Sequence, residues 1–142
     1  MRSISESVEI TASPEVVWQI LTDVKSYSDW NPFIKQASGE ITVGATLVLR
    51  MFPGGDGKPT TFRPRVLIAD PPRTLCWRGS LGIPGIFDGE HRFVLHRTAS
   101  GTNLIQSEKF TGLLTPFLGG AVARTADDFR ALNQALKHRA EA

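Results

Sequence analysis

Three polar residues that could perform chemistry interrupt two segments whose faces are otherwise apolar. Strand periodicity places His91 on the apolar face of residues 87–96, and it places Gln106 and Glu108 on that of residues 104–110. The apolar members of these two faces are Phe87, Phe93, Leu95, Leu104 and Phe110. An imidazole changes its charge near neutral pH, and a neighbouring carboxylate can orient it. His91 and Glu108 are therefore the candidate catalytic pair, suited to general acid–base work on an enolisable ligand.

The same pair also has a structural interpretation. Buried polar groups usually satisfy one another or nearby backbone groups, so His91 and Glu108 on neighbouring strands would form such a contact or would orient a ligand. In the catalytic interpretation, His91 abstracts a proton next to a carbonyl group and Glu108 orients the imidazole. The residues alone leave both interpretations open.

Other reaction centres lack the residues that they need. His91 and His96 lie on opposite faces of one expected strand, and no Cys, His or Asp cluster has the spacing of metal ligands, so we expect no metal. Cys76 and Ser107 have no base on their own faces, which argues against nucleophilic catalysis. Residues 54–57 are glycine-rich but lack the Lys-Ser/Thr of a phosphate loop, so they predict a hairpin turn. We expect no cofactor.

The first third of the chain predicts one strand followed by two short helices. Residues 4–11 alternate apolar with polar side chains, as a half-buried strand does. Ser13 and Pro14 match the N-cap and the first position of a helix. The second helix would run to Trp30, because Pro32 disfavours a helical conformation of the residue before it.

The middle of the chain predicts six short strands joined by turns rich in Gly, Pro, Asp and Ser, which together form an antiparallel meander. The expected strands are residues 34–41, 46–52, 61–69, 74–79, 86–96 and 102–110. Pro64 has no backbone N–H to donate to a ladder, which favours an edge strand or a bulge there. With residues 4–11, the expected sheet has seven strands.

The last third predicts one amphipathic helix of about twenty residues, with Thr115 and Pro116 as its N-cap and first position. Arg124 and Asp128 fall on its polar side. The apolar stripe consists of Leu118, Ala121, Val122, Thr125, Phe129, Leu132 and Leu136. The order of elements is that of an α+β domain whose long helix covers one face of a curved antiparallel sheet. Such a sheet leaves a pocket between itself and the helix.

Ligand-binding residues are expected among the aromatic and polar side chains that face this pocket. They are Trp30, Phe33, Phe62, Trp77, Phe87, His91, Phe93, Gln106, Glu108, Phe110, Phe117 and Phe129. Trp77 is the strongest candidate, because its indole N–H needs a partner and its strand precedes the loop at residues 81–86. That loop predicts either a lid over an apolar ligand or a segment packed on the end helix. The pair Gly119 and Gly120 indicates close approach or mobility, or a packing contact with a large aromatic ring, which we favour.

Six segments carry a family resemblance: residues 10–18 (ITASPEVVW), 30–33 (WNPF), 89–93 (GEHRF), 101–102 (GT), 108–112 (EKFTG) and 129–137 (FRALNQALK). Through them the chain resembles the START-like (SRPBCC) superfamily, in particular its polyketide cyclase/dehydrase-like branch, over essentially its whole length. The resemblance implies a helix-grip fold, in which the C-terminal helix lies across the sheet above a deep apolar cavity. Members include lipid, sterol and quinone carriers, hormone receptors, and cyclases or dehydratases that act on polyketides. They share no single set of catalytic residues, so no role is carried over.

Composition limits the remaining possibilities. The 142 residues, 41% hydrophobic and 21% charged, suffice for one core and so predict a single domain. The resemblance implies that residues 1–142 form a single START-like domain. No apolar stretch approaches the ~20 residues that span a membrane, and residues 1–6 lack the apolar part of a signal peptide. A lone cysteine fits a reducing cytoplasm. The net charge of +2 is too small and scattered to indicate binding of nucleic acid.

We therefore expect a cytoplasmic domain that binds a small hydrophobic ligand, such as a lipid, quinone, aromatic or polyketide-like molecule, in an internal cavity. The alternative is a cyclase or dehydratase that uses His91 and Glu108 as its acid–base pair. A third interpretation, an interaction module that forms a homodimer through an edge strand or the apolar loop, also stays open.

Overall fold

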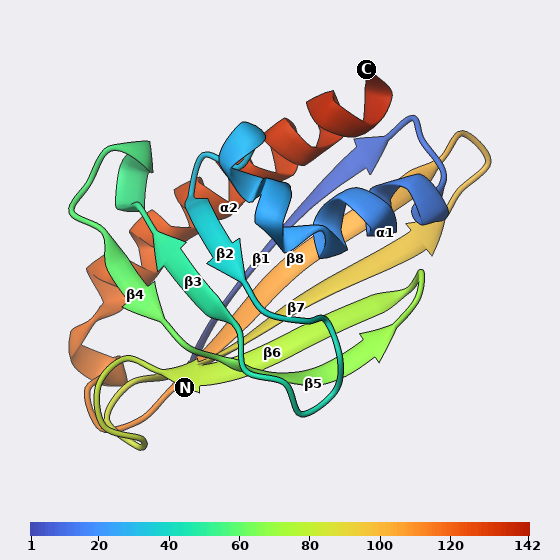
Figure 1. The fold of residues 1–142 in the computed structure, drawn as a ribbon. Helices are drawn as coiled ribbons and strands as arrows, with labels where there is room; N and C mark the ends of the chain where they lie inside the picture. The colour runs from blue at the N-terminus through green and yellow to red at the C-terminus, as the bar shows by residue number, and fades with distance from the viewer.

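A computed structural model describes residues 1–142, which form two antiparallel sheets, two α-helices and three short 3-10 helices (Figure 1). The strands are β1 (Arg2–Ile10), β2 (Ile34–Ser38), β3 (Val48–Met51), β4 (Thr60–Phe62), β5 (Arg65–Asp70), β6 (Thr74–Ser80), β7 (Asp88–Arg97) and β8 (Thr102–Thr111). The α-helices are α1 (Pro14–Thr22) and α2 (Gly119–Glu141). The 3-10 helices are η1 (Val24–Asp29), η2 (Pro53–Gly55) and η3 (Thr115–Phe117).

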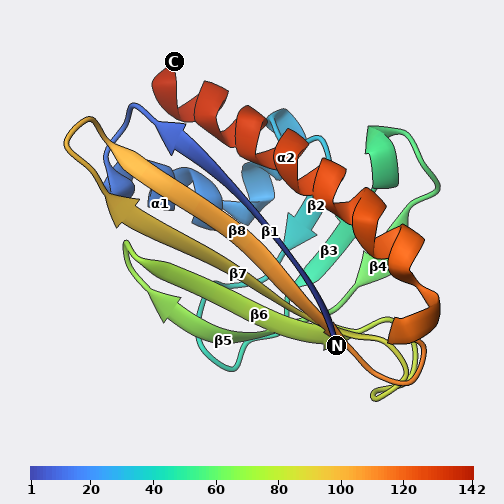
Figure 2. The same cartoon turned by 180° about the vertical axis from the view of Figure 1, so that it is seen from behind.

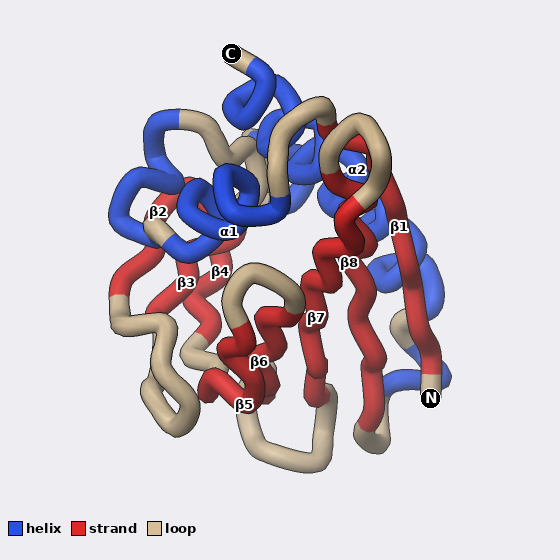
Figure 3. Tube along the Cα trace, turned by 90° about the vertical axis from the view of Figure 1, so that its right-hand side faces the viewer, coloured by secondary structure: helices blue, strands red, loops and turns tan.

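The two sheets together make one curved wall. The five-stranded sheet has the order β1-β8-β7-β6-β5, and the three-stranded sheet has the order β2-β3-β4. They join where the Leu47 N–H donates to the Pro64 carbonyl at 2.8 Å and where Thr46 pairs with Arg65. In Figure 3, β2, β3 and β4 lie on one side and β7, β8 and β1 on the other, with β5 and β6 between them.

The structure has eight strands where the sequence predicts seven. The expected strand at residues 61–69 is divided into β4 and β5, which belong to different sheets. The division falls at Pro64, because proline has no N–H to donate to a ladder. The strands around residues 39–47 are shorter than expected, because Gly39 and Gly44 adopt positive φ angles of 115° and 92° that belong to turns.

The start of α1 confirms the capping pattern. The Val16 N–H donates to Ser13 Oγ at 3.3 Å, and Pro14 occupies the first turn. The second expected helix is the 3-10 helix η1, which ends one residue before Trp30. Tyr27 from η1 is buried, and its hydroxyl donates to the Leu21 carbonyl, so η1 is bound to the end of α1.

Helix α2 lies along β1 at the edge of the five-stranded sheet and extends towards η2 beside the three-stranded sheet (Figure 2). It begins at Gly119 and not at Pro116, which corrects the predicted start. Residues 115–117 form the separate turn η3 instead. The Arg2 side chain donates to the carbonyls of Thr115 (3.1 Å) and Pro116 (3.3 Å), and the Thr115 carbonyl also accepts the Leu118 N–H at 3.2 Å.

The glycine pair at the start of α2 also has a different neighbour from the one expected. A Cβ atom on Gly119 would lie 2.9 Å from Cζ of Arg2, so this glycine admits a guanidinium and not an aromatic ring. Gly120 is exposed and would meet only the Arg124 side chain, at 3.5 Å.

The core extends through both sheets and both α-helices. It is a cluster of 19 buried residues, among them Trp77 and Phe93 from the five-stranded sheet, Leu49 from the three-stranded sheet, and Val17 and Phe129 from the helices. This arrangement confirms the helix-grip fold. No helix in it is both long and apolar enough to cross a bilayer.

Candidate functional site

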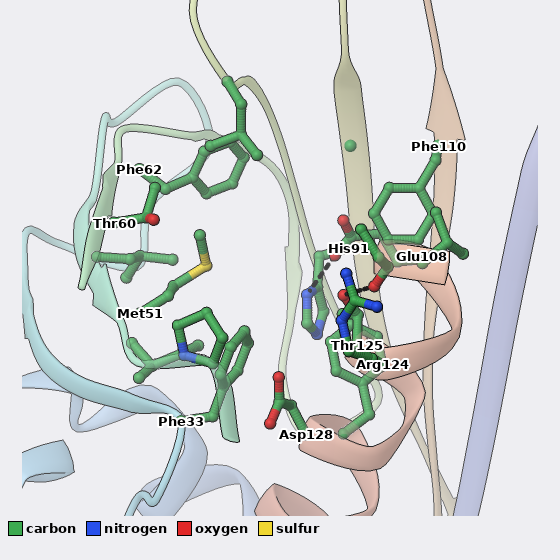
Figure 4. A pocket seen from close by; sticks show the side chains of 18 of the residues that line it. Phe33, Met51, Thr60, Phe62, His91, Glu108, Phe110, Arg124, Thr125 and Asp128 are labelled. Carbon is green, nitrogen blue, oxygen red and sulfur yellow. Dashed lines mark hydrogen bonds and ion pairs between the residues drawn. The ribbon is translucent and has the colours of Figure 1, made fainter. Parts of the chain in front are cut away.

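A cavity of about 270 Å³ lies between the three-stranded sheet, strands β6–β8 and the first turns of α2 (Figure 4). Twelve of its 20 lining residues are hydrophobic. Four of the lining residues are exposed and mark its mouth: Pro53, Thr60, Leu81 and Arg124. The volume is near the lower end of the range for small-molecule sites, so the cavity suits a compact ligand.

The cavity wall brings together most of the residues selected from the sequence. Those on the wall are Phe33, Phe62, Trp77, Phe87, His91, Glu108, Phe110 and Phe129. Phe87 and Phe110 stack with their ring centroids 5.5 Å apart. The Trp77 and His91 centroids are 5.1 Å apart. The period-two pattern therefore identified the inward faces of the strands correctly.

Four selected residues do not line the cavity, which corrects the predicted lining set. Trp30 packs edge-on against Tyr27, with ring centroids 5.2 Å apart. Phe93 and Gln106 face inward but are fully covered by the core, since alternation sets the face of a side chain and not its depth. Phe117 is 81% exposed, because it belongs to η3 and not to the long helix.

The polar centre of the wall is His91, and both of its ring nitrogens are engaged. His91 and Glu108 lie directly opposite each other in the β7–β8 register. His91 Nδ1 is 2.8 Å from Glu108 Oε1, and His91 Nε2 is 2.9 Å from Gln106 Oε1. The imidazole therefore bridges a carboxyl group and an amide.

Two backbone carbonyls, which can only accept, decide where the protons of this network lie. Asn133 Nδ2 donates to the Glu6 carbonyl at 3.1 Å, so Asn133 Oδ1 is the acceptor for Gln106 Nε2 at 2.8 Å. Gln106 Nε2 also reaches the Phe129 carbonyl, at 3.2 Å. Gln106 Oε1 therefore accepts from His91, which places a proton on His91 Nε2. A second proton is then shared between Nδ1 and the carboxyl group, as imidazolium with carboxylate or as imidazole with carboxylic acid.

Glu108 is the member of the pair that can reach a ligand. Its Oε1 faces His91. Its Oε2 lies close to Gly89, because a Cβ atom added to Gly89 would be only 2.5 Å from Oε2. The absence of a side chain at Gly89 therefore leaves room for this carboxyl group. The Glu108 side chain is 14% exposed and the His91 side chain 5%. The expected role of His91 as the group that abstracts a proton does not fit this geometry, because neither ring nitrogen is free.

Helix α2 adds polar side chains to the cavity that sequence reasoning missed as site residues. Arg124, Thr125 and Asp128 line it, although Arg124 and Asp128 were expected on the outer, polar side. Asp128 is buried, and its Oδ1 accepts a hydrogen bond from the Gly54 N–H at 2.9 Å, which ties η2 to α2. The steps of four and three residues from Ala121 to Thr125 and Asp128 are the signal that could have identified this stripe.

Burial raises the pKa of the Asp128 carboxyl group above its ordinary range. The Gly54 N–H lowers this pKa in part, and the neighbouring charge of Asp127 raises it further. The cavity thus contains an acid with a perturbed pKa, which lies below His91 in Figure 4.

Residues 1–141 match the family described as "Polyketide cyclase / dehydrase and lipid transport". No curated protein matches the chain. The Zhui aromatase/cyclase from Streptomyces sp. R1128 is similar in structure, with a TM-score of 0.78, 20% identity, and coverage of 99% of this chain and 93% of that one.

Two further solved structures share the fold. A START superfamily protein from Mycobacterium smegmatis has a TM-score of 0.76 and 23% identity, and the match covers 98% of this chain and 97% of that one. The di-domain ARO/CYC BexL of the BE-7585A biosynthetic pathway has a TM-score of 0.78 and 17% identity, over 99% of this chain and 50% of that one. At these identities the similarity establishes the fold alone.

Replacement of Gln106 tests the proton arrangement. Gln106→Leu leaves the His91 Nε2–H and Asn133 Oδ1 without partners, so we expect a loss of about 1–3 kcal/mol in the free energy of unfolding, measured with urea. The exposed Gln134 on α2 is the matched control, and Gln134→Leu should change this free energy little. In the unaltered protein, ¹⁵N NMR should show His91 protonated at Nε2; a neutral ring protonated only at Nδ1 would contradict the assignment.

Asp128 predicts a pH dependence of stability. A raised pKa means that the folded state binds more protons than the unfolded state, so the free energy of unfolding falls as pH rises from the ordinary Asp pKa through the raised one. Asp128→Asn keeps the acceptor for Gly54 and removes the charge, so it should be more stable than the wild type at neutral pH but not in acid. Urea unfolding across that range measures the difference, with Asp56→Asn, at an exposed carboxyl group that forms no ion pair, as the control. A gain that persists after Asp128 is protonated would refute this account.

Proposed function

Because the chain belongs to the polyketide cyclase/dehydrase and lipid transport family, we propose that it binds a compact, largely apolar molecule whose one oxygen-bearing group meets Glu108. The observation that carries this proposal is a mostly apolar cavity with a hydrogen-bonded His91–Glu108 pair on its wall. Apolar walls with a few placed polar groups are the usual composition of small-molecule sites.

The aromatic side chains favour a ring-containing ligand. Phe33, Phe62, Trp77 and Phe129 contribute faces and edges from both sheets and from α2. Offset and edge-to-face contacts between such rings and a planar ligand add to the gain from burial. Given the small volume, the favoured ligands have one ring or two fused rings and a carbonyl or hydroxyl group.

The polar groups give the ligand a direction. A ligand hydroxyl can donate to Glu108 Oε2, and a ligand carbonyl can accept from Oε2 when a further proton, beyond the one shared with His91, is bound there. Since Glu108 lies on the sheet side of the cavity and Arg124 is exposed at the mouth, the oxygen-bearing end would point inward and the remainder of the ligand towards α2.

A second candidate function is proton transfer, and the engaged nitrogens of His91 decide its form. Glu108 would take a proton from the carbon next to a ligand carbonyl, so that the C–H bond breaks, an O–H bond forms on Glu108 and the electron pair moves to an enolate oxygen. His91 would act as a positioning residue, holding the carboxyl group through Nδ1.

A cavity-filling substitution tests the binding proposal. Ala121 lines the cavity, so Ala121→Phe should weaken the binding of 1-tetralone, 2-naphthol and 1,4-naphthoquinone at least about tenfold in calorimetric titrations. Ala131→Phe places the same ring on the solvent side of the same helix and should leave binding unchanged. The proposal fails if none of the three compounds binds the wild type saturably, or if both variants bind them equally well.

Exchange of the α-protons of 1-tetralone in D₂O, followed by ¹H NMR, decides between binding and catalysis. If Glu108 transfers protons, exchange should exceed the buffer rate and fall about 100-fold or more in Glu108→Gln, while binding persists. A wild-type rate equal to that of buffer removes the catalytic candidate and leaves the binding proposal in place.

A further inference from the structure

Five exposed apolar side chains gather beside the cavity on two loops, and we call them the mouth patch: Leu81, Ile83, Leu113, Leu114 and Phe117. Phe117 is 81% exposed, and Ile83 and Leu113 are each 73% exposed. Large side chains exposed together mark interaction sites, whereas single exposed ones need no explanation. Their number and exposure here indicate a surface that meets an apolar partner.

The two loops of the mouth patch are joined by their backbones. The Leu113 N–H donates to the Gly85 carbonyl at 3.0 Å, and the Leu114 N–H donates to the Ile86 carbonyl at 2.9 Å. Gly112 permits this approach, because a Cβ atom there would lie 2.5 Å from the Ile86 carbonyl oxygen. The patch is therefore presented as one unit.

The Asp88 carboxylate holds the first loop from its base. It accepts hydrogen bonds from Ser80 Oγ at 2.6 Å and from the Gly85 N–H at 3.2 Å, and both bonds lower the pKa of Asp88. Asp88 is the acidic residue closest in sequence to this loop. Its carboxylate is already hydrogen-bonded within the fold, and its side chain is only 12% exposed.

The mouth patch is continuous with the cavity. Leu81 belongs to both, and the stacked Phe87 and Phe110 line the cavity at the bases of the two loops. On the helix side, η3 carries Phe117 and leads into α2, whose Ala121 and Val122 line the cavity. An apolar molecule could pass from the patch to the cavity along these side chains.

Charges around the mouth patch favour an anionic partner. Residues 81–87 and 112–118 contain no charged residue. Arg2 lies on the carbonyls of Thr115 and Pro116, and Arg124 lines the cavity mouth. Neither arginine forms an ion pair with a carboxylate. A second copy docked patch to patch would bring these cations together, which disfavours that occupant.

We propose that the mouth patch inserts into the surface of an anionic lipid bilayer, with Arg2 and Arg124 at the level of the lipid headgroups. Apolar side chains that enter the boundary of the acyl chains, flanked by basic residues, are the two elements of reversible membrane-surface binding. A fluid bilayer can accommodate side chains that protrude individually, because it needs no pocket that matches their shape. The consequence that the ligand exchanges between bilayer and cavity rests on the proposed function, whereas the docking does not.

Vesicle co-sedimentation tests the docking. The full chain should bind vesicles of phosphatidylcholine mixed with phosphatidylglycerol more strongly than vesicles of phosphatidylcholine alone, and added salt should weaken the binding. Ile83→Ser/Phe117→Ser should reduce binding to the mixed vesicles at least about tenfold. Val43→Ser, which alters a 63% exposed residue between β2 and β3, should bind as the wild type does.

Arg124→Gln separates the electrostatic part of the proposal. It should weaken binding to the mixed vesicles and leave binding to phosphatidylcholine alone unchanged. The docking proposal is overturned if the wild type binds neither kind of vesicle, if Ile83→Ser/Phe117→Ser binds as well as the wild type, or if sedimentation shows a wild-type dimer that this double variant dissociates.

Titration with 1-tetralone keeps this test apart from that of the proposed function. Ile83 and Phe117 lie outside the cavity wall, so their double variant should bind the compound with wild-type affinity while losing vesicle binding. A wild type that binds vesicles but none of the cavity probes would retain the docking proposal and refute the cavity function.

Discussion

The hydrogen-bonded chain from the Glu6 carbonyl through Asn133 and Gln106 to His91 is the contact on which the site depends. Its members come from β1, α2, β8 and β7, so a single row of buried polar groups joins the helix to three adjacent strands. Apolar contacts alone would allow α2 to slide or rotate over the sheet, because they are not directional. Directional hydrogen bonds fix one position of the helix, and with it the position of Asp128 on the cavity wall.

This hydrogen-bonded chain also connects His91 to the core and to the cavity wall at once. Its Nε2 serves the fold by bonding Gln106, and its Nδ1 serves the site by holding Glu108. Because both ring nitrogens form hydrogen bonds, the imidazole holds the Glu108 carboxyl group in place on the cavity wall. The sequence left a structural and a catalytic interpretation of this pair open, and the contacts of His91 show its place in the fold.

Local patterns predicted the sheet well, and what they missed depends on distant contacts. Period-two alternation placed Trp77, His91 and Glu108 on inward faces, since the pleat alone decides the face. Pro64 also ended a strand as its missing N–H requires. The start of α2 could not be predicted locally, because Thr115 and Pro116 fit a 3-10 turn as well as the start of an α-helix. This turn contacts Arg2, more than one hundred residues away in the chain. Asp128 was misplaced for the same reason, since its partner Gly54 belongs to a remote turn.

The pairing of β1 with β8 has a consequence for folding during synthesis. Strand β1 (Arg2–Ile10) pairs in the sheet only with β8 (Thr102–Thr111), and α2, which follows β8 in the chain, packs along β1. During synthesis, β1 therefore leaves the ribosome about ninety residues before the strand with which it pairs. Contacts this far apart in sequence slow folding and prolong the exposure of an unpaired strand edge. The nascent chain would be most vulnerable to aggregation just before β8 emerges.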